Sequence, residues 1–193
     1  MPIVLVGLVF ISVMMLSRGA LGSSENMSKK RNWDLDDIEP ENQGGSLKTD
    51  YDIIFEKYAD KYDVPFALLK AHAYRESSLK PTAFMDENPS KRSDRVGWAS
   101  RGLMQTLWWP KSQRFKKYGY PDEILSNGEA IFRPEVSIDI GAQIIRDNLK
   151  ACDGVLRDAI NMYNTGKKEA QYQAPNDYVG KVLSTYNLLI NKG

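Results

Sequence analysis

Apolar residues recur at three- and four-residue steps from Tyr51 almost to the C-terminus, which is the spacing of one face of an α-helix. Proline and glycine interrupt this series at points where a helix would begin or end. Asp50 is expected to cap the first helix through its side chain. The uninterrupted segments predict helices over residues 51–62, 66–76, 134–149 and 155–163, and a last helix that follows Pro175.

The same stretch contains no pair of alternating strands and no internal repeat. We therefore expect a mainly α domain over residues 51–193, in which any β ribbon is short and confined to Ala83–Arg101. A chain of 193 residues, of which 42% are apolar, has room for one such domain and its extensions.

The first 22 residues form a hydrophobic segment of a different kind. Ile3 to Leu16 is apolar apart from one glycine and one serine, and Ala20-Leu21-Gly22 provides a small-x-small cleavage pattern before Ser23. The run is shorter than the roughly 20 residues that a membrane span needs. It lacks a basic start, however, and Arg18 lies on its C-terminal side. Residues 1–22 are therefore expected to be a signal peptide or a membrane anchor.

Residues 23–50 are polar, with Pro40 and the pair Gly44-Gly45, and they show no sustained apolar period. This composition predicts a flexible linker. The basic run Lys29 to Arg31 is followed by acidic residues that would cancel its field. We therefore expect no nucleic-acid partner.

Cysteine and histidine are too scarce for most metal and nucleophile chemistry. Cys152 is the single cysteine, which excludes an intrachain disulfide and a thiolate cluster. His72 is the single histidine, too few for an imidazole metal site. We expect no metal and no other cofactor.

Glu76 lies near the end of the helix that follows Pro65, on the same face as Leu69 and Ala73. A carboxyl at the edge of a core is partly buried, and burial raises its pKa toward the range of a general acid. The alternative is a structural Glu76 at the helix end, paired with His72 or with Arg75.

Three short motifs occur in a fixed order along the chain. They are Glu76-Ser77-Ser78-Leu79-Lys80-Pro81, Arg101-Gly102-Leu103-Met104-Gln105 and Tyr163-Asn164-Thr165-Gly166. Together with the segment from Arg133 to Gly141 and with Tyr178-Val179, they resemble the soluble lytic transglycosylase (SLT) domain family of the lysozyme-like superfamily. The resemblance covers about Tyr51 to Tyr186.

This resemblance implies a lysozyme-like fold and an enzyme that cleaves the glycan strands of peptidoglycan outside the cytoplasm. Glu76 would protonate the oxygen between N-acetylmuramic acid and N-acetylglucosamine. Its carboxylate would then take the proton of the muramic acid 6-hydroxyl, which closes a 1,6-anhydro ring. A single carboxyl would act first as acid and then as base.

The other motif residues would support the substrate in the same family pattern. Ser77 would hydrogen-bond near the Glu76 carboxyl or the substrate. Met104 and Gln105 would line the saccharide groove, and Tyr163 and Asn164 would face it. The expected substrate-binding residues are Ser77, Gly102, Met104, Gln105, Tyr163, Asn164 and Tyr178.

The chain departs from the family pattern between Glu76 and Gly102, where the charged, loop-like segment Met85 to Val96 adds length. This segment contains Asp86, Glu87 and Asp94, so a lysozyme-like hydrolase with a second carboxylate, as in goose-type relatives, stays open. A third alternative is a phage or secretion-apparatus protein that only binds peptidoglycan. The aromatic side chains that would stack on sugars or complete a core are Trp98, Trp108 and Trp109.

Overall fold

The described part of the computed structural model covers residues 47–88, 90–168 and 177–191 and contains six α-helices, three short 3-10 helices and one small antiparallel sheet. The segment 1–22 and nearly all of the expected linker lie outside these residues. The mainly α fold with a short sheet is confirmed. The helices are α1 (Asp52–Tyr62), α2 (Phe66–Ser77), α3 (Asp122–Leu125), α4 (Pro134–Ala151), α5 (Leu156–Thr165) and α6 (Asp177–Asn191).

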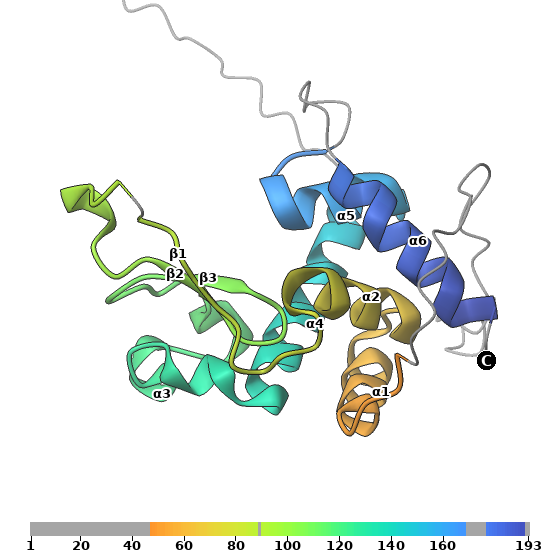
Figure 1. Ribbon diagram of the computed structural model, residues 1–193, viewed down its shortest axis with the longest axis horizontal. Helices are drawn as coiled ribbons and strands as arrows, with labels where there is room; N and C mark the ends of the chain where they lie inside the picture. Colours follow the sequence, from red (N-terminus) through yellow and green to blue (C-terminus); the bar gives the residue numbers. More distant parts are fainter. Residues whose placement is uncertain (1–46, 89, 169–176, 192–193) are drawn as a thin grey trace, which may run out of the picture. The chain divides into compact units, whose positions relative to one another are not determined.

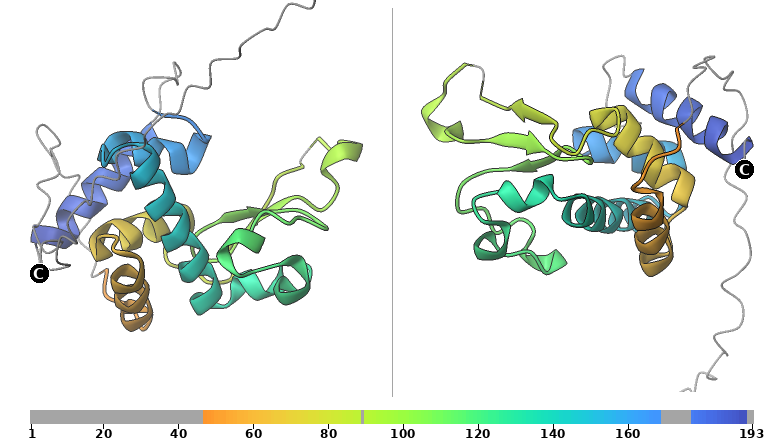
Figure 2. Two further views of the ribbon diagram at one scale, coloured as in Figure 1. Left: turned by 180° about the vertical axis from the view of Figure 1, so that it is seen from behind. Right: turned by 60° about the horizontal axis from the view of Figure 1, so that its bottom comes forward.

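The sheet has three strands in the order β1 (Phe84–Asp86), β2 (Ala99–Arg101) and β3 (Thr106–Trp108). The third strand lies beyond the predicted range Ala83–Arg101, so that boundary is wrong. The turn at Gly102 folds the chain back, and residues 106–108 pair antiparallel with β2. β1 and β2 belong to an arm that projects away from the long helices α1, α2, α5 and α6 in the views of Figure 1 and Figure 2.

The main core lies among the long helices. α2 packs along α6, while α1 and α5 both contact α4 (Figure 1). The apolar faces that the three- and four-residue spacing predicts are buried in this core. Fully buried side chains in this core include Phe55, Leu69, Ile138, Ile160 and Val182.

A second, smaller core lies where the sheet meets α4. Trp108 of β3 packs there with Phe115, Leu125 and Ile131, and α4 contributes Ile140. α4 therefore has one apolar face in each core.

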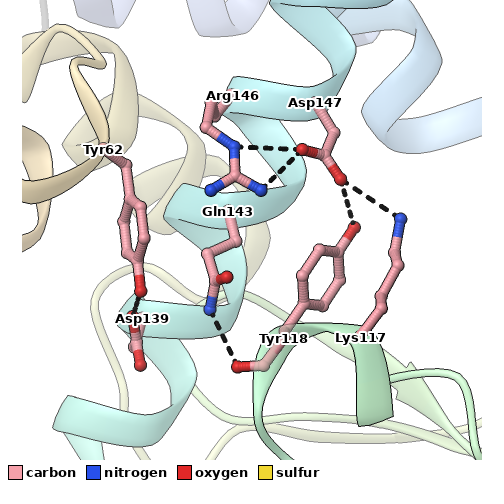
Figure 3. Close-up of polar contacts among 7 residues, drawn as sticks. All are labelled: Tyr62, Lys117, Tyr118, Asp139, Gln143, Arg146 and Asp147. Carbon is pink, nitrogen blue, oxygen red and sulfur yellow. Dashed lines mark hydrogen bonds and ion pairs between the residues drawn. The ribbon is translucent and has the colours of Figure 1, made fainter.

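A polar stripe runs along α4 between its apolar faces, at residues spaced four apart (Figure 3). Asp139 accepts a hydrogen bond of 2.5 Å from the Tyr62 hydroxyl at the end of α1. Gln143 donates to the backbone carbonyl of Tyr118 at 3.2 Å, and Asp147 accepts from the Tyr118 hydroxyl at 3.0 Å. These bonds hold α1 and the 3-10 helix η3 (Lys116–Tyr118) against α4.

The start of α1 differs from its prediction. Tyr51, not Asp50, occupies the cap position, and no side chain caps the helix there. Asp52 in the first turn instead accepts hydrogen bonds from the Thr49 hydroxyl and from Lys70, both at 2.7 Å. The buried Lys70 ammonium needs an anionic partner, and Asp52 provides it.

No helix in the part of the chain that the structure describes combines the length and the apolar character that crossing a bilayer requires.

Candidate active site

Glu76 occupies the last turn of α2, where the helix ends abruptly. Ser78 and Leu79 both adopt left-handed backbone conformations, with φ of 52° and 61°. The Ser78 amide donates to the Tyr74 carbonyl at 2.8 Å, which satisfies one of the helix's last carbonyls. The chain therefore leaves the helix after Ser77, one residue beyond Glu76.

The Glu76 carboxyl is half-buried and contacts α6. The Tyr178 hydroxyl donates a hydrogen bond of 2.5 Å to its Oε1. Burial raises the pKa of Glu76 from 4.5 to about 7, and the charge of Glu87 acts in the same direction, while the Tyr178 bond and the Arg75 charge oppose it. A carboxyl with this pKa is protonated in a large fraction of molecules near neutral pH, as a general acid must be.

Two aromatic side chains and the single histidine pack behind Glu76. His72 lies one helical turn before it, buried, with its Nδ1 at 3.0 Å from the Tyr178 hydroxyl. The His72 ring also lies 4.6 Å from the Tyr163 ring, between centroids. Burial lowers the pKa of His72 to about 3, so the imidazole is neutral. A salt bridge between Glu76 and His72, the structural alternative, does not fit this neutral ring, whose Nδ1 contacts Tyr178 instead.

The segment Gly102 to Gln105 is a tight turn that faces this cluster. Gly102 has a φ of 73°, and a Cβ there would lie 2.3 Å from the Ile131 carbonyl oxygen, so only glycine fits. The Met104 side chain is fully buried. The Met104 carbonyl accepts a hydrogen bond of 2.8 Å from the Tyr163 hydroxyl. This bond joins the turn to α5 next to Glu76.

The remaining predicted residues have mixed surroundings. The Ser77 hydroxyl donates to the Ala73 carbonyl at 2.9 Å, within its own helix, and not to Glu76. The Gln105 side-chain amide donates to the carbonyls of Ala83 and Gly102, both at 3.0 Å, which closes the turn. Asn164 is exposed at the end of α5. The structure thus gathers Glu76, Tyr163 and Tyr178, while the buried Met104 side chain does not line a groove.

Of the three carboxylates in the inserted segment, only Glu87 acts on Glu76. Asp86 is exposed and accepts a hydrogen bond from the Asn88 backbone, and Asp94 pairs with Arg92 at 2.9 Å. Glu87 is half-buried, accepts a hydrogen bond of 2.6 Å from the Ser100 hydroxyl, and helps to raise the pKa of Glu76.

Strand alternation assigns the tryptophans to opposite faces of the sheet. Trp108 lies on the same face as Arg101, whose guanidinium carbon is 4.8 Å from its ring centroid, and it is buried in the second core. Trp98 lies on the face of Ser100. The partly exposed Trp98 and Trp109 rings stack on each other, with centroids 4.8 Å apart. Because Glu87 bonds to Ser100, this stacked pair shares the sheet face that carries Glu87.

The described residues contain a hollow away from the predicted site and no candidate metal site. A hollow of about 330 Å³ beside α3 is lined by Lys111, Gln113, Asp122, Glu123, Ser126 and Asn127, none of them a predicted site residue. Among the described residues, no group of three His, Cys, Asp or Glu side chains could hold a metal ion.

Sequence reasoning missed two contacts at this site. The first is the hydrogen-bonded series from His72 through Tyr178 to Glu76, although the four-residue spacing of His72 and Glu76 already placed both on one helical face. The second is the proximity of Glu87, which no local pattern separates from Asp86 or Asp94.

Comparisons with known proteins agree with this architecture. Residues 53–187 match the family model described as the transglycosylase SLT domain. The fold is similar to that of a lytic transglycosylase Slt from Pseudomonas aeruginosa, solved as an inactive glutamate-to-glutamine mutant, with a TM-score of 0.56 and 19% sequence identity. The match covers 75% of this chain and 25% of that one, so the chain corresponds to about a quarter of that protein. No curated protein matches the chain.

Proposed function

Because the chain belongs to the transglycosylase SLT domain family, we propose that it is a peptidoglycan lytic transglycosylase in which Glu76 is the catalytic acid and base. The observation that carries the proposal is the Glu76 carboxyl, which is half-buried, has a pKa of about 7 and is held by Tyr178. The whole Pseudomonas protein is about three times as long as this chain, and neither its length nor its fold transfers its activity.

In the first step, protonated Glu76 gives its proton to the oxygen that links N-acetylmuramic acid to N-acetylglucosamine. The bond from the muramic acid C1 to that oxygen breaks, and positive charge develops on the sugar ring. The resulting Glu76 carboxylate stabilises this charge and keeps the hydrogen bond from Tyr178, which becomes stronger once its acceptor is ionised.

In the second step, the 6-hydroxyl of the same muramic acid attacks C1 and gives its proton to the Glu76 carboxylate. The products are a 1,6-anhydro end and a free N-acetylglucosamine end, and Glu76 is again protonated. A pKa near 7 suits both steps, because neither protonation state is strongly disfavoured.

The sheet face that carries Glu87, Trp98 and Trp109 would extend the glycan site away from Glu76. Trp109→Ala is expected to raise KM for long strands severalfold with little change in kcat, since stacking would be lost in ground and transition states alike. Phe84→Ala is the matched control, because Phe84 is exposed on the opposite face of the same sheet. If both variants had the same KM, this face of the sheet would not bind the glycan.

The decisive experiment is mass spectrometry of the fragments that the full-length chain releases from purified peptidoglycan, with Glu76→Gln as the control. Anhydromuropeptides that disappear with Glu76→Gln would support the transglycosylase. If the folded chain binds peptidoglycan and releases nothing, it is a binding module and the proposal fails.

Hydrolysis is the second candidate, and the charge of Glu87 near Glu76 is the observation that favours it. In that reaction Glu87 would take a proton from water as the water attacks C1, and the products would carry reducing ends. Glu87→Gln separates the two. A hydrolase would lose its products, whereas a transglycosylase would keep its anhydro products and its activity would begin to fall at a lower pH.

We further propose that the chain acts at the cell wall, in local opening during phage entry or exit, in a secretion apparatus or in remodelling. The support is the hydrophobic segment 1–22, which suits secretion or anchoring. Recovery of mature protein that begins at Ser23 would favour secretion. Recovery of intact chain from membranes would favour an anchor, and recovery from virions would favour a particle component.

A further inference from the structure

We propose that His72 is a positioning residue whose ring proton resides on Nδ1, and that it thereby directs the Tyr178 hydroxyl proton onto Oε1 of Glu76. The inference rests on the proposed function only for the use that Glu76 makes of its own proton. The arrangement of hydrogens can be measured without any substrate.

The three side chains form one continuous series between two helices. His72 and Glu76 lie one turn apart on α2, and Tyr178 of α6 reaches both, with its hydroxyl 3.0 Å from Nδ1 and 2.5 Å from Oε1. His72 and Tyr178 are 1% and 8% exposed, so water has little access to replace either contact. Each contact must therefore be a hydrogen bond between the groups present.

The hydroxyl has one proton to donate, which leaves two possible arrangements. If Nδ1 carries the ring proton, His72 donates to Tyr178 and Tyr178 donates to Glu76. If Nδ1 is bare, Tyr178 donates to His72, and Glu76 can complete the series only by donating its own acid proton inward.

The ionised state of Glu76 decides between these arrangements. A carboxylate only accepts hydrogen bonds, so Tyr178 must donate to it. A bare Nδ1 would then face the hydroxyl oxygen, lone pair against lone pair, inside the protein. Only the Nδ1–H form allows both contacts in both protonation states of Glu76, so His72 need not change form during a catalytic cycle.

This arrangement has a consequence for the acid. With Oε1 occupied by the Tyr178 proton, the dissociable proton of Glu76 resides on Oε2. The inward-facing oxygen is the acceptor, and the other is the one that can meet a glycosidic oxygen.

Several other groups act on this series and set its background. Arg75 lies 6.0 Å from the Tyr178 ring centroid, Tyr163 packs on His72, and Glu87 repels the Glu76 charge. None of the three replaces the contact between His72 and Tyr178. Substitution of His72 therefore leaves the charges of Arg75 and Glu87 in place.

The direct test is ¹⁵N NMR of the untagged full-length chain labelled on histidine, because His72 is the only histidine in the sequence. Ring nitrogen shifts and their couplings to the ring carbon protons distinguish the two neutral forms and the imidazolium. At about pH 6, where a free histidine is largely charged, we expect a neutral ring with its proton on Nδ1. A proton on Nε2, or on both nitrogens, overturns the proposal whether or not the chain is an enzyme.

The functional test uses His72→Asn, which keeps an N–H donor near the position of Nδ1, and His72→Leu, which removes it. For His72→Leu we expect roughly a tenfold loss in kcat/KM, the cost of one weakened hydrogen bond to a charged group, and an upward shift of the pH at which kcat/KM falls. His72→Asn should keep most of the wild-type profile.

Tyr178→Phe should give the same upward shift, and adding His72→Leu to it should shift the profile no further. A lower rate at every pH with an unmoved profile would mean that His72 only supports packing, and would overturn the proposal. If no variant or wild type has activity, the proposed function fails while the NMR result still decides the position of the proton.

Discussion

Replacing Glu76 with glutamine is expected to stabilise the folded chain at alkaline pH while it removes activity. Burial raises the pKa of this carboxyl from 4.5 to about 7 on folding. Between these two pH values the folded chain holds a proton that the unfolded chain releases, so the free energy of unfolding decreases as the pH rises. This loss of free energy of unfolding is absent below pH 4.5, the pKa in the unfolded chain, and complete above about pH 7.

The size of the effect follows from the two pKa values. At about 1.4 kcal/mol for each pH unit between them, ionised Glu76 costs the folded state about 3 kcal/mol. Glutamine has a similar shape, can accept the Tyr178 hydrogen bond and cannot ionise. Glu76→Gln should therefore match the wild type at low pH and exceed it by up to this amount at about pH 8.5.

Urea unfolding of both proteins, followed by tryptophan fluorescence across this pH range, measures the difference. Glu123→Gln is a suitable control, because Glu123 is exposed in the first turn of α3 and lies beside the hollow there, apart from Glu76. A constant difference between wild type and Glu76→Gln at all pH values would show that folding does not raise the pKa of Glu76. Glu76 would then be ionised at neutral pH and could not serve as a general acid there.

Three other substitutions test the surroundings of the site. Gly102→Ala should lower the free energy of unfolding by about 3 kcal/mol or more, because its Cβ would collide with the Ile131 carbonyl in a left-handed turn; unchanged urea stability would contradict this. Tyr163→Phe should cost about 1 kcal/mol and reduce muropeptide release, since the buried Met104 carbonyl loses its donor; wild-type stability and rate would show that the bond is dispensable. Asp139→Asn should lower the melting temperature measurably, because two tyrosine hydroxyls lose an ionised acceptor; an unchanged melting curve would refute that.

The helices could be predicted because each has a local cause in the sequence. Pro65 and Pro134 mark where α2 and α4 begin, and the apolar spacing identifies the face that each helix buries. The start of α1 was harder to predict, because the local sequence does not distinguish Asp50 from Asp52 as the residue that stabilises it. The buried Lys70, distant in sequence, gives the anionic role to Asp52.

The site residues that belong to the sequence motifs could be predicted. Glu76, Tyr163 and Tyr178 come together as the order of motifs indicates. The position of Glu87 was not predictable, since it depends on strand register, and one residue of slip would turn its side chain to the other face. β3 was also missed, because its pairing with β2 is a tertiary contact that no local pattern indicates.

α4 has one apolar face in each hydrophobic cluster. Because the two clusters share this helix, loss of one removes packing partners from the other. The part of the chain that the structure describes should accordingly behave as a single cooperative unit, with coincident melting reported by Trp108 in one cluster and by tyrosines in the other. Backbone amides in the middle of α4, around Gly141, should exchange with solvent deuterium only through global unfolding, as slowly as any in the chain.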